Sequence, residues 1–209
     1  MSSPVVACLL WTAIAFASGS IPYSVLVGKF ALGKDIRRFG DGNPGGTNVA
    51  RAGGKLWGGL AVFLDGIKAA IPVWLAFHWA GVDGMWLVPV ALAPTLGHAY
   101  SPFLGFRGGK AIASTAGVWL GLITWEGPIA LVVFLLLAYY LIDVDGWSTM
   151  AMMAGFGLYL LVRNRIFVWT YPLFAPTTAS FLVIWLGQTL LLAWKHRGDL
   201  RRRPRLRRA

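Results

Sequence analysis

The chain has 209 residues, of which 57% are hydrophobic and 13% are charged, and its formal net charge is +11. This apolar composition excludes an ordinary soluble domain, and the successive long apolar stretches indicate an all-α protein that crosses the membrane several times. A spanning helix needs about 20 apolar residues, so the length allows roughly seven transmembrane helices with short connections and no soluble domain. The single cysteine, Cys8, excludes an intrachain disulfide.

The apolar runs define the predicted helices in chain order. We expect the first helix to remain uncleaved, because no Lys or Arg precedes the run from Val5 to Phe16 as it would in a signal peptide. The spans form one transmembrane domain over residues 1–194. A basic tail over residues 195–209 follows, and we expect it to be mobile and to lie against anionic lipid headgroups. The predicted spans are residues 4–27, 56–79, 85–100, 111–125, 128–142, 147–162 and 173–194.

The placement of Lys and Arg predicts the orientation, because these residues collect on the cytoplasmic side of a membrane. With the N-terminus outside and the C-terminus in the cytoplasm, 16 of the 19 basic residues are cytoplasmic, and Lys68 lies within a span. Arg163 and Arg165 are then the two that fall outside, and the opposite orientation would reverse this ratio. The cytoplasmic segments are 28–55, 101–110, 143–146 and the tail.

Two glycine-rich segments stand out between the apolar runs. The first, residues 40–51, reads Gly-Asp-Gly-Asn-Pro-Gly-Gly-Thr-Asn-Val-Ala-Arg, and we expect it to form a polar loop. Glycine lets the backbone approach a phosphate closely, and amide, hydroxyl and guanidinium donors suit a polyol phosphate. The residues of this segment that could form such a site are Asn43, Gly45, Thr47, Asn48 and Arg51.

The second glycine-rich segment, residues 105–110, reads Gly-Phe-Arg-Gly-Gly-Lys and directly precedes a helix-forming run. This places Gly108, Gly109 and Lys110 at a helix N-terminus, where backbone N–H groups and the helix dipole favour an anion. The spacing is not that of a Walker loop, so nucleotide binding is unsupported. The alternative interpretation is a tight turn with a membrane-anchoring lysine.

Ionisable and polar residues near the second segment favour a site there. A neutral His98 could accept a proton from a substrate hydroxyl, and a protonated one could donate to a phosphate, although a structural histidine is the alternative. Ser101 lies between His98 and the glycines, and no second His or Cys is spaced to form a metal site with His98. Asp65 and Lys68, three residues apart, can pair on one helix face. They form either a structural ion pair or part of a substrate cavity.

With these residues in view, the chain resembles the bacterial acyl-phosphate-dependent glycerol-3-phosphate acyltransferases, the PlsY family, mainly over residues 19–120. The resemblance implies a seven-helix enzyme of the bacterial inner membrane with a cytoplasmic active site. It would transfer an acyl group from acyl-phosphate to the 1-hydroxyl of sn-glycerol 3-phosphate, giving lysophosphatidate and phosphate. Neither a metal, nor an organic cofactor, nor a nucleic-acid partner is implied. The segments that carry the resemblance are Gly19-Ser20-Ile21-Pro22, Gly42 to Val49 with Arg51, Asp65-Gly66-Ile67-Lys68, Gly97-His98, Ser101, Phe103, Phe106 and Gly108-Gly109-Lys110.

The resemblance implies a role for each segment. The second glycine-rich segment would cradle a phosphate with the Lys110 ammonium and the glycine amides, the first would position glycerol phosphate, and His98 would orient a phosphate or assist proton removal. No covalent enzyme intermediate is required, because acyl-phosphate is already activated. The implied catalytic residues are Asp41, Arg51, His98 and Lys110, and the implied substrate-binding residues are Asn43, Gly45, Thr47, Asn48, Asp65, Lys68, Ser101, Gly108, Gly109 and His196.

Three departures from the family pattern bear on activity. Asp41 stands where the family usually has a functional Ser, and it adds negative charge beside two anionic substrates. Near the C-terminus, His196 and Arg197 are retained, but Asp199 replaces an Asn and a later Glu is absent. Residues 143–148 read Asp-Val-Asp-Gly-Trp-Ser in place of a Ser-rich segment.

Two alternatives stay open beside the acyltransferase. Asp41 and the altered tail favour an inactive or regulatory paralogue. A transporter of a phosphorylated metabolite would use similar polar segments, but it should show broken helices in paired positions of two related halves. No internal repeat is evident in the sequence, which counts against the transporter.

Overall fold

A computed structural model describes residues 3–170 and 178–207, with side chains described over residues 3–163 and 179–207. Within these ranges the regular secondary structure is helical, apart from one antiparallel bridge between Ile142 and Leu206. The predicted all-α fold is therefore confirmed. The long helices are α1 (Pro4–Ser20), α2 (Tyr23–Leu32), α4 (Lys55–Trp74), α5 (Leu87–Ala99), α6 (Ile112–Ile123), α7 (Glu126–Leu141), α8 (Asp145–Thr170) and α9 (Thr178–Lys195).

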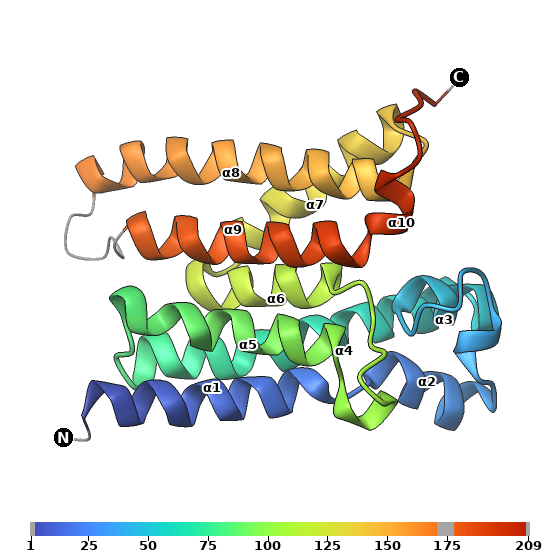
Figure 1. Cartoon of the computed structure of the whole chain (residues 1–209), viewed down its shortest axis with the longest axis horizontal. Coiled ribbons are helices and arrows are strands. Elements are labelled where there is room, and N and C mark those ends of the chain that lie inside the picture. Colours follow the sequence, from blue (N-terminus) through green and yellow to red (C-terminus); the bar gives the residue numbers. More distant parts are fainter. Residues whose placement is uncertain (1–2, 171–177, 208–209) are drawn as a thin grey trace.

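The long helices lie side by side in one bundle, and two short helices, α3 (Gly46–Gly53) and α10 (Arg197–Leu200), lie at one end of it. That end also holds α2, and it is opposite the N-terminus (Figure 1). Two helical stretches of the described residues, Pro4–Leu32 and Lys55–Trp79, are long and apolar enough to cross a membrane. Large apolar side chains cover the outside of the bundle, as lipid contact requires. Examples more than 60% exposed are Leu56, Leu136, Leu158 and Leu190.

The first predicted span is not one continuous helix. It breaks at Ile21 and Pro22, because a residue before proline is disfavoured in the α conformation, and Ile21 is accordingly extended (φ −62°, ψ 120°). The freed carbonyl oxygen of Ile21 accepts a hydrogen bond from Lys68 Nζ at 2.6 Å. The break therefore places a buried cation beside a peptide carbonyl that has left the helical hydrogen-bond pattern.

Another predicted boundary also differs. The sixth predicted span ends at residue 162, whereas α8 continues to Thr170. Arg163 lies within the helix, and its guanidinium is paired with Glu126 at the start of α7. The predicted beginning of the last span, residues 173–177, lies outside the described residues.

Small residues let the central helices approach closely. α4 and α6 run parallel, with Gly117 against the backbone of Gly66 and Gly121 against the backbone of Ala70. A Cβ atom at Gly121 would lie 2.7 Å from the Ala70 carbonyl oxygen, so a larger residue would push the helices apart. Such contacts are typical of helix packing in membranes.

The tail differs from the mobile arm that its charge predicts. The Asp143 amide donates to the Arg205 carbonyl at 2.9 Å, and the Arg207 amide donates to the Leu141 carbonyl at 2.9 Å. The indole of Trp147 donates to the Arg202 carbonyl at 2.9 Å. Through residue 207 the tail is thus held to the connection between α7 and α8 by its own backbone; residues 208–209 lie outside the described part.

The orientation stays a prediction, and it can be measured directly. A C-terminal fusion to a reporter that is active only in the cytoplasm should be active, because 16 of the 19 basic residues then lie on the inner side. A fusion to a reporter that is active only outside the cytoplasm should be inactive. The reverse pattern would contradict both the topology and a cytoplasmic site.

Candidate active site

The first glycine-rich segment is only partly a loop. Residues 40–45 turn sharply, with Gly40 and Gly42 at positive φ of 56° and 74°, where a side chain would be strained. From Gly46 the chain forms helix α3 with Gly45 as its N-cap, so the prediction of a polar loop is wrong for residues 46–51. Val49 and Ala52 bury the inner face of α3. The predicted site residues Thr47, Asn48 and Arg51 are therefore held on a helix.

The polar side chains of this segment form one hydrogen-bonded network. Asp41 Oδ1 accepts from Asn48 Nδ2 at 3.0 Å and from the Asn43 amide at 3.1 Å. Asn48 Nδ2 also donates to the Asn43 carbonyl at 2.9 Å, and Arg51 Nη1 donates to Asn48 Oδ1 at 2.9 Å. Asn48 is buried at the centre, whereas Thr47 is exposed on the first turn of α3.

Lys110 joins the two glycine-rich segments. Its Nζ lies 3.0 Å from Asp41 Oδ2 and 3.4 Å from Oδ2 of Asp199 on α10. Partial burial opposes ionisation of Asp41, but the hydrogen bond from Lys110, with those from Asn43 and Asn48, holds the pKa of that carboxyl below its usual range. Burial likewise opposes charging of Lys110, but Asp41 and Asp199 hold the pKa of the ammonium above its usual range. Asp41 and Lys110 are therefore both charged at neutral pH.

The backbone of the second segment is packed against the end of α5. The Gly109 amide donates to the His98 carbonyl at 3.1 Å, so it is not free for a phosphate and the predicted glycine cradle is wrong at this amide. A Cβ atom at Gly109 would collide with the His98 ring, and one at Gly108 would lie 2.9 Å from the Ala99 carbonyl carbon. Both glycines thus allow the segment to lie flat on α5 and present Lys110 two residues before α6 begins.

Asp65 and Lys68 form the predicted ion pair. Lys68 Nζ lies 2.6 Å from Asp65 Oδ1, and both side chains are only 2% exposed. Ser24 Oγ donates to Asp65 Oδ2 at 2.5 Å, and His98 Nδ1 lies 3.6 Å from Asp65 Oδ1. Lys68 also donates to the Ile21 carbonyl. Together these contacts support the structural interpretation, because the pair stabilises the break between α1 and α2 and lies next to His98.

Three further polar residues hold the last helix and the second segment in place. Ser101 Oγ donates to the Ser20 carbonyl at 2.6 Å, and Lys195 Nζ donates to the carbonyls of Ala99 and Gly108 at 2.9 and 3.1 Å. The His196 ring, 1% exposed, has Nδ1 2.8 Å from the Leu192 carbonyl oxygen. The sequence did not single out Ser24, Lys195 or Asp199 as site residues. Of these three, only Asp199 was noted in the sequence, as a departure from the family pattern.

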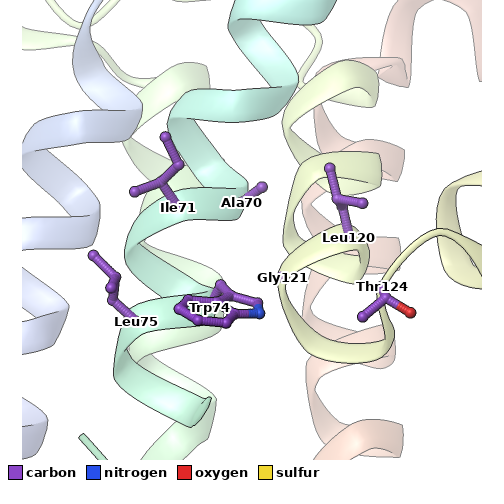
Figure 2. Close-up of a pocket in the computed structure, with 7 residues that line it drawn as sticks. All are labelled: Ala70, Ile71, Trp74, Leu75, Leu120, Gly121 and Thr124. Carbon is purple, nitrogen blue, oxygen red and sulfur yellow. The ribbon is translucent and has the colours of Figure 1, made fainter. Parts of the chain in front are cut away.

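An apolar pocket of about 300 Å³ lies between α4 and α6 (Figure 2). Gly121 in its wall is nine residues beyond Ile112, so the pocket lies about 13–14 Å along α6 from the Lys110 end. Among the described residues no group of three His, Cys, Asp or Glu side chains is placed to hold a metal ion. The lining residues are Ala70, Ile71, Trp74, Leu75, Leu120, Gly121 and Thr124.

Known proteins are similar to this chain in sequence and in fold. The profile of a family described as "Glycerol-3-phosphate acyltransferase" matches residues 9–205. A glycerol-3-phosphate acyltransferase of Anaeromyxobacter sp. (strain Fw109-5) is 37% identical over 200 residues, which are 93% of this chain and 91% of the relative. Glycerol-3-phosphate acyltransferase 1 of Thermotoga maritima is 36% identical, over 90% of this chain and 94% of that one.

A solved structure is also similar. The crystal structure of PlsY, an integral membrane glycerol 3-phosphate acyltransferase, in its glycerol 3-phosphate form has a TM-score of 0.76 and 29% identity. The similarity covers 93% of this chain and 90% of PlsY. The lysophosphatidic acid form of the same protein matches with the same TM-score and 28% identity.

Proposed function

Because the chain belongs to the glycerol-3-phosphate acyltransferase family, we propose that it transfers an acyl group from an acyl-phosphate to the 1-hydroxyl of sn-glycerol 3-phosphate. The products are lysophosphatidate and phosphate, and the site faces the cytoplasm from a bacterial inner membrane. The family and the similarity to PlsY, an integral membrane protein, support acylation of glycerol 3-phosphate in a membrane. The donor and the acylated hydroxyl are the chemistry that this site fits best.

The convergence of the two glycine-rich segments carries the proposal. Two anionic substrates must meet in one place, and the contact of Lys110 with the Asp41–Asn48–Arg51 network brings an ammonium and a guanidinium to the same end of the bundle. Arg and Lys bind phosphate in complementary ways, since the guanidinium offers a planar fork and the ammonium a point charge. This end of the bundle can therefore hold one phosphate on each cation.

The reaction needs little beyond this arrangement. The 1-hydroxyl oxygen attacks the acyl carbon, the bond from that carbon to the phosphate oxygen breaks, and the hydroxyl proton leaves with the phosphate. Negative charge grows on the carbonyl oxygen and on the leaving phosphate, so a cation held beside them lowers the barrier. We assign Lys110 to the leaving phosphate and Arg51, with Asn43 and Asn48, to glycerol 3-phosphate.

The acyl chain would follow α6 away from the polar end. The apolar pocket between α4 and α6 lies about 13–14 Å along that helix, and its lining residues Ile71 and Trp74 are 53% and 45% exposed, so it suits the end of a long chain (Figure 2). The donor can therefore enter from the bilayer while its phosphate stays at the surface.

Purified full-length protein in detergent tests the reaction. With labelled glycerol 3-phosphate and hexadecanoyl-phosphate it should form labelled lysophosphatidate and one phosphate for each ester. An acyl thioester supplied as the donor should give no product. Product from the thioester and none from the acyl-phosphate would contradict the proposed donor, and product from neither would contradict the function.

Filling the apolar pocket should shorten the preferred acyl chain. In Leu120→Trp the larger side chain takes the space of about two CH₂ groups, each worth about 0.8 kcal/mol when buried. The ratio of kcat/KM for hexadecanoyl-phosphate over decanoyl-phosphate should fall roughly tenfold. Leu136→Trp, which adds the same ring at an exposed position of α7, is the matched control and should leave the ratio unchanged. An unchanged ratio in Leu120→Trp would separate the pocket from the acyl chain.

A further inference from the structure

The Lys110 ammonium is already occupied by two carboxylates. An ammonium has three N–H donors, and two of the directions around Nζ are taken by Asp41 Oδ2 at 3.0 Å and Asp199 Oδ2 at 3.4 Å. These contacts are made by residues from opposite ends of the chain, and each side chain is only partly exposed. One donor direction is left for any other ligand.

A phosphate cannot use that third direction at low cost. Three ligands arranged tetrahedrally about 3 Å from one nitrogen lie roughly 5 Å from one another, where like charges repel. A phosphate there would face the charges of Asp41 and Asp199 at once. Substrate binding therefore requires one carboxylate to move away.

The two carboxylates are not held equally. Asp41 is fixed by Asn48 Nδ2 and by the Asn43 amide through its other oxygen, so it belongs to the network of the first segment. Among the described side chains, Lys110 is the group that holds the Asp199 carboxylate, and the contact is the longer of the two. Asp199 also stands on α10, a helix of four residues at the surface. It is the group that can leave.

We propose that Asp199 is a specificity-determining residue. Before substrate binds, its carboxylate occupies the position beside Lys110 that the phosphate of the acyl-phosphate takes, and that phosphate displaces it outward. The inference rests on the proposed function, since it takes Lys110 as the phosphate ligand. The affinity of the site is then set by an exchange of one anion for another. Ligands with a full double negative charge displace Asp199 better than weakly charged ones do.

Removing the competing charge should raise affinity, which is the opposite of what loss of a binding residue does. Asp199→Asn in the purified full-length protein should bind inorganic phosphate, the leaving group assigned to Lys110, and hexadecanoyl-phosphate about two- to fivefold more tightly by calorimetric titration. This range matches the strength of partly exposed ion pairs. The KM for hexadecanoyl-phosphate should fall by the same factor.

Two variants serve as controls. Asp199→Glu keeps the charge and should keep the wild-type affinity. Asp143→Asn removes a carboxylate on the same side of the bundle that faces Arg207 rather than Lys110, and it should change neither affinity. A gain in Asp143→Asn equal to that in Asp199→Asn would reduce the effect to overall charge and overturn the proposal.

Unchanged or weaker binding of both probes by Asp199→Asn would also overturn it, as would absence of phosphate binding in wild type and variant alike. If Asp199→Asn fails to fold, Asp199→Ser carries the same expectation, and failure of both would make the contact structural. Titration needs no turnover. Tighter binding without acyl transfer would therefore contradict the proposed function alone, and acyl transfer with unchanged affinity would contradict the role of Asp199 alone.

Discussion

Lys110→Met should lower the turnover of acyl transfer by one to two orders of magnitude. The methionine keeps the apolar stem and removes the charge, and a hydrogen bond to a charged group contributes about 1.5–3 kcal/mol. If the ammonium acts on the leaving phosphate, the loss should appear mainly in kcat and less in KM. Lys110→Arg should fall between the two, since it keeps the charge but changes the donor geometry.

Lys55→Met is the matched control, because Lys55 is exposed at the start of α4 and takes no part in the network. It should keep wild-type kinetics. The partly exposed contacts of Lys110 with Asp41 and Asp199 add little to stability, so Lys110→Met should unfold near the wild-type temperature. A folded Lys110→Met protein with unchanged specific activity would remove Lys110 from the reaction and leave it a membrane anchor.

Lys68→Met should destabilise the fold by about 3–5 kcal/mol. It leaves the carboxylate of Asp65, 2% exposed, without its cation, and breaking a buried ion pair from one side carries a cost of this size. The carbonyl of Ile21 also loses one of its two donors at the break between α1 and α2, and among the described residues only the Tyr23 amide is left. For a chain of this length the unfolding temperature in detergent should fall by about 6–20 °C.

The double variant Asp65→Asn with Lys68→Met tests the cause. It removes both charges together, so most of the lost stability should return, as is found when buried pairs are replaced as a unit. Lys29→Met, at an exposed position of α2, should leave the unfolding temperature unchanged. A double variant that is less stable than Lys68→Met would show that the charge of Asp65 stabilises the site through Ser24 or His98 instead.

The sequence predicts the bundle well because long apolar runs leave the chain few alternatives in a membrane. It also predicts the pair of Asp65 and Lys68, since their spacing puts them on one face of a helix. It fails at α3, where glycines argue against a helix, because the burial of Val49 and Ala52 stabilises the helix and propensity does not. Tertiary contacts of this kind leave no local pattern to read.

The candidate site is also predictable from the sequence only in part. Two of the departures that the resemblance implies, at Asp41 and Asp199, are visible in the sequence as separate features. Only the fold shows that both carboxylates contact Lys110. The packing of the Gly109 amide against His98 is likewise invisible in the sequence, because the glycine is equally suited to bind an anion or to permit a close backbone contact.

The position of Asp199 also sets how late in synthesis its contact with Lys110 can form. The contact between Lys110 and Asp199 spans 89 residues, and a ribosome that adds about 5–20 residues per second reaches Asp199 roughly 4–18 seconds after Lys110. During that interval α1 to α6 can already lie in the bilayer, with the Lys110 ammonium not yet covered by α10. Until α10 forms, Asp41 is the carboxylate that Lys110 contacts among the described residues, so the exchange of anions proposed for this site depends on one of the later-made parts of the chain.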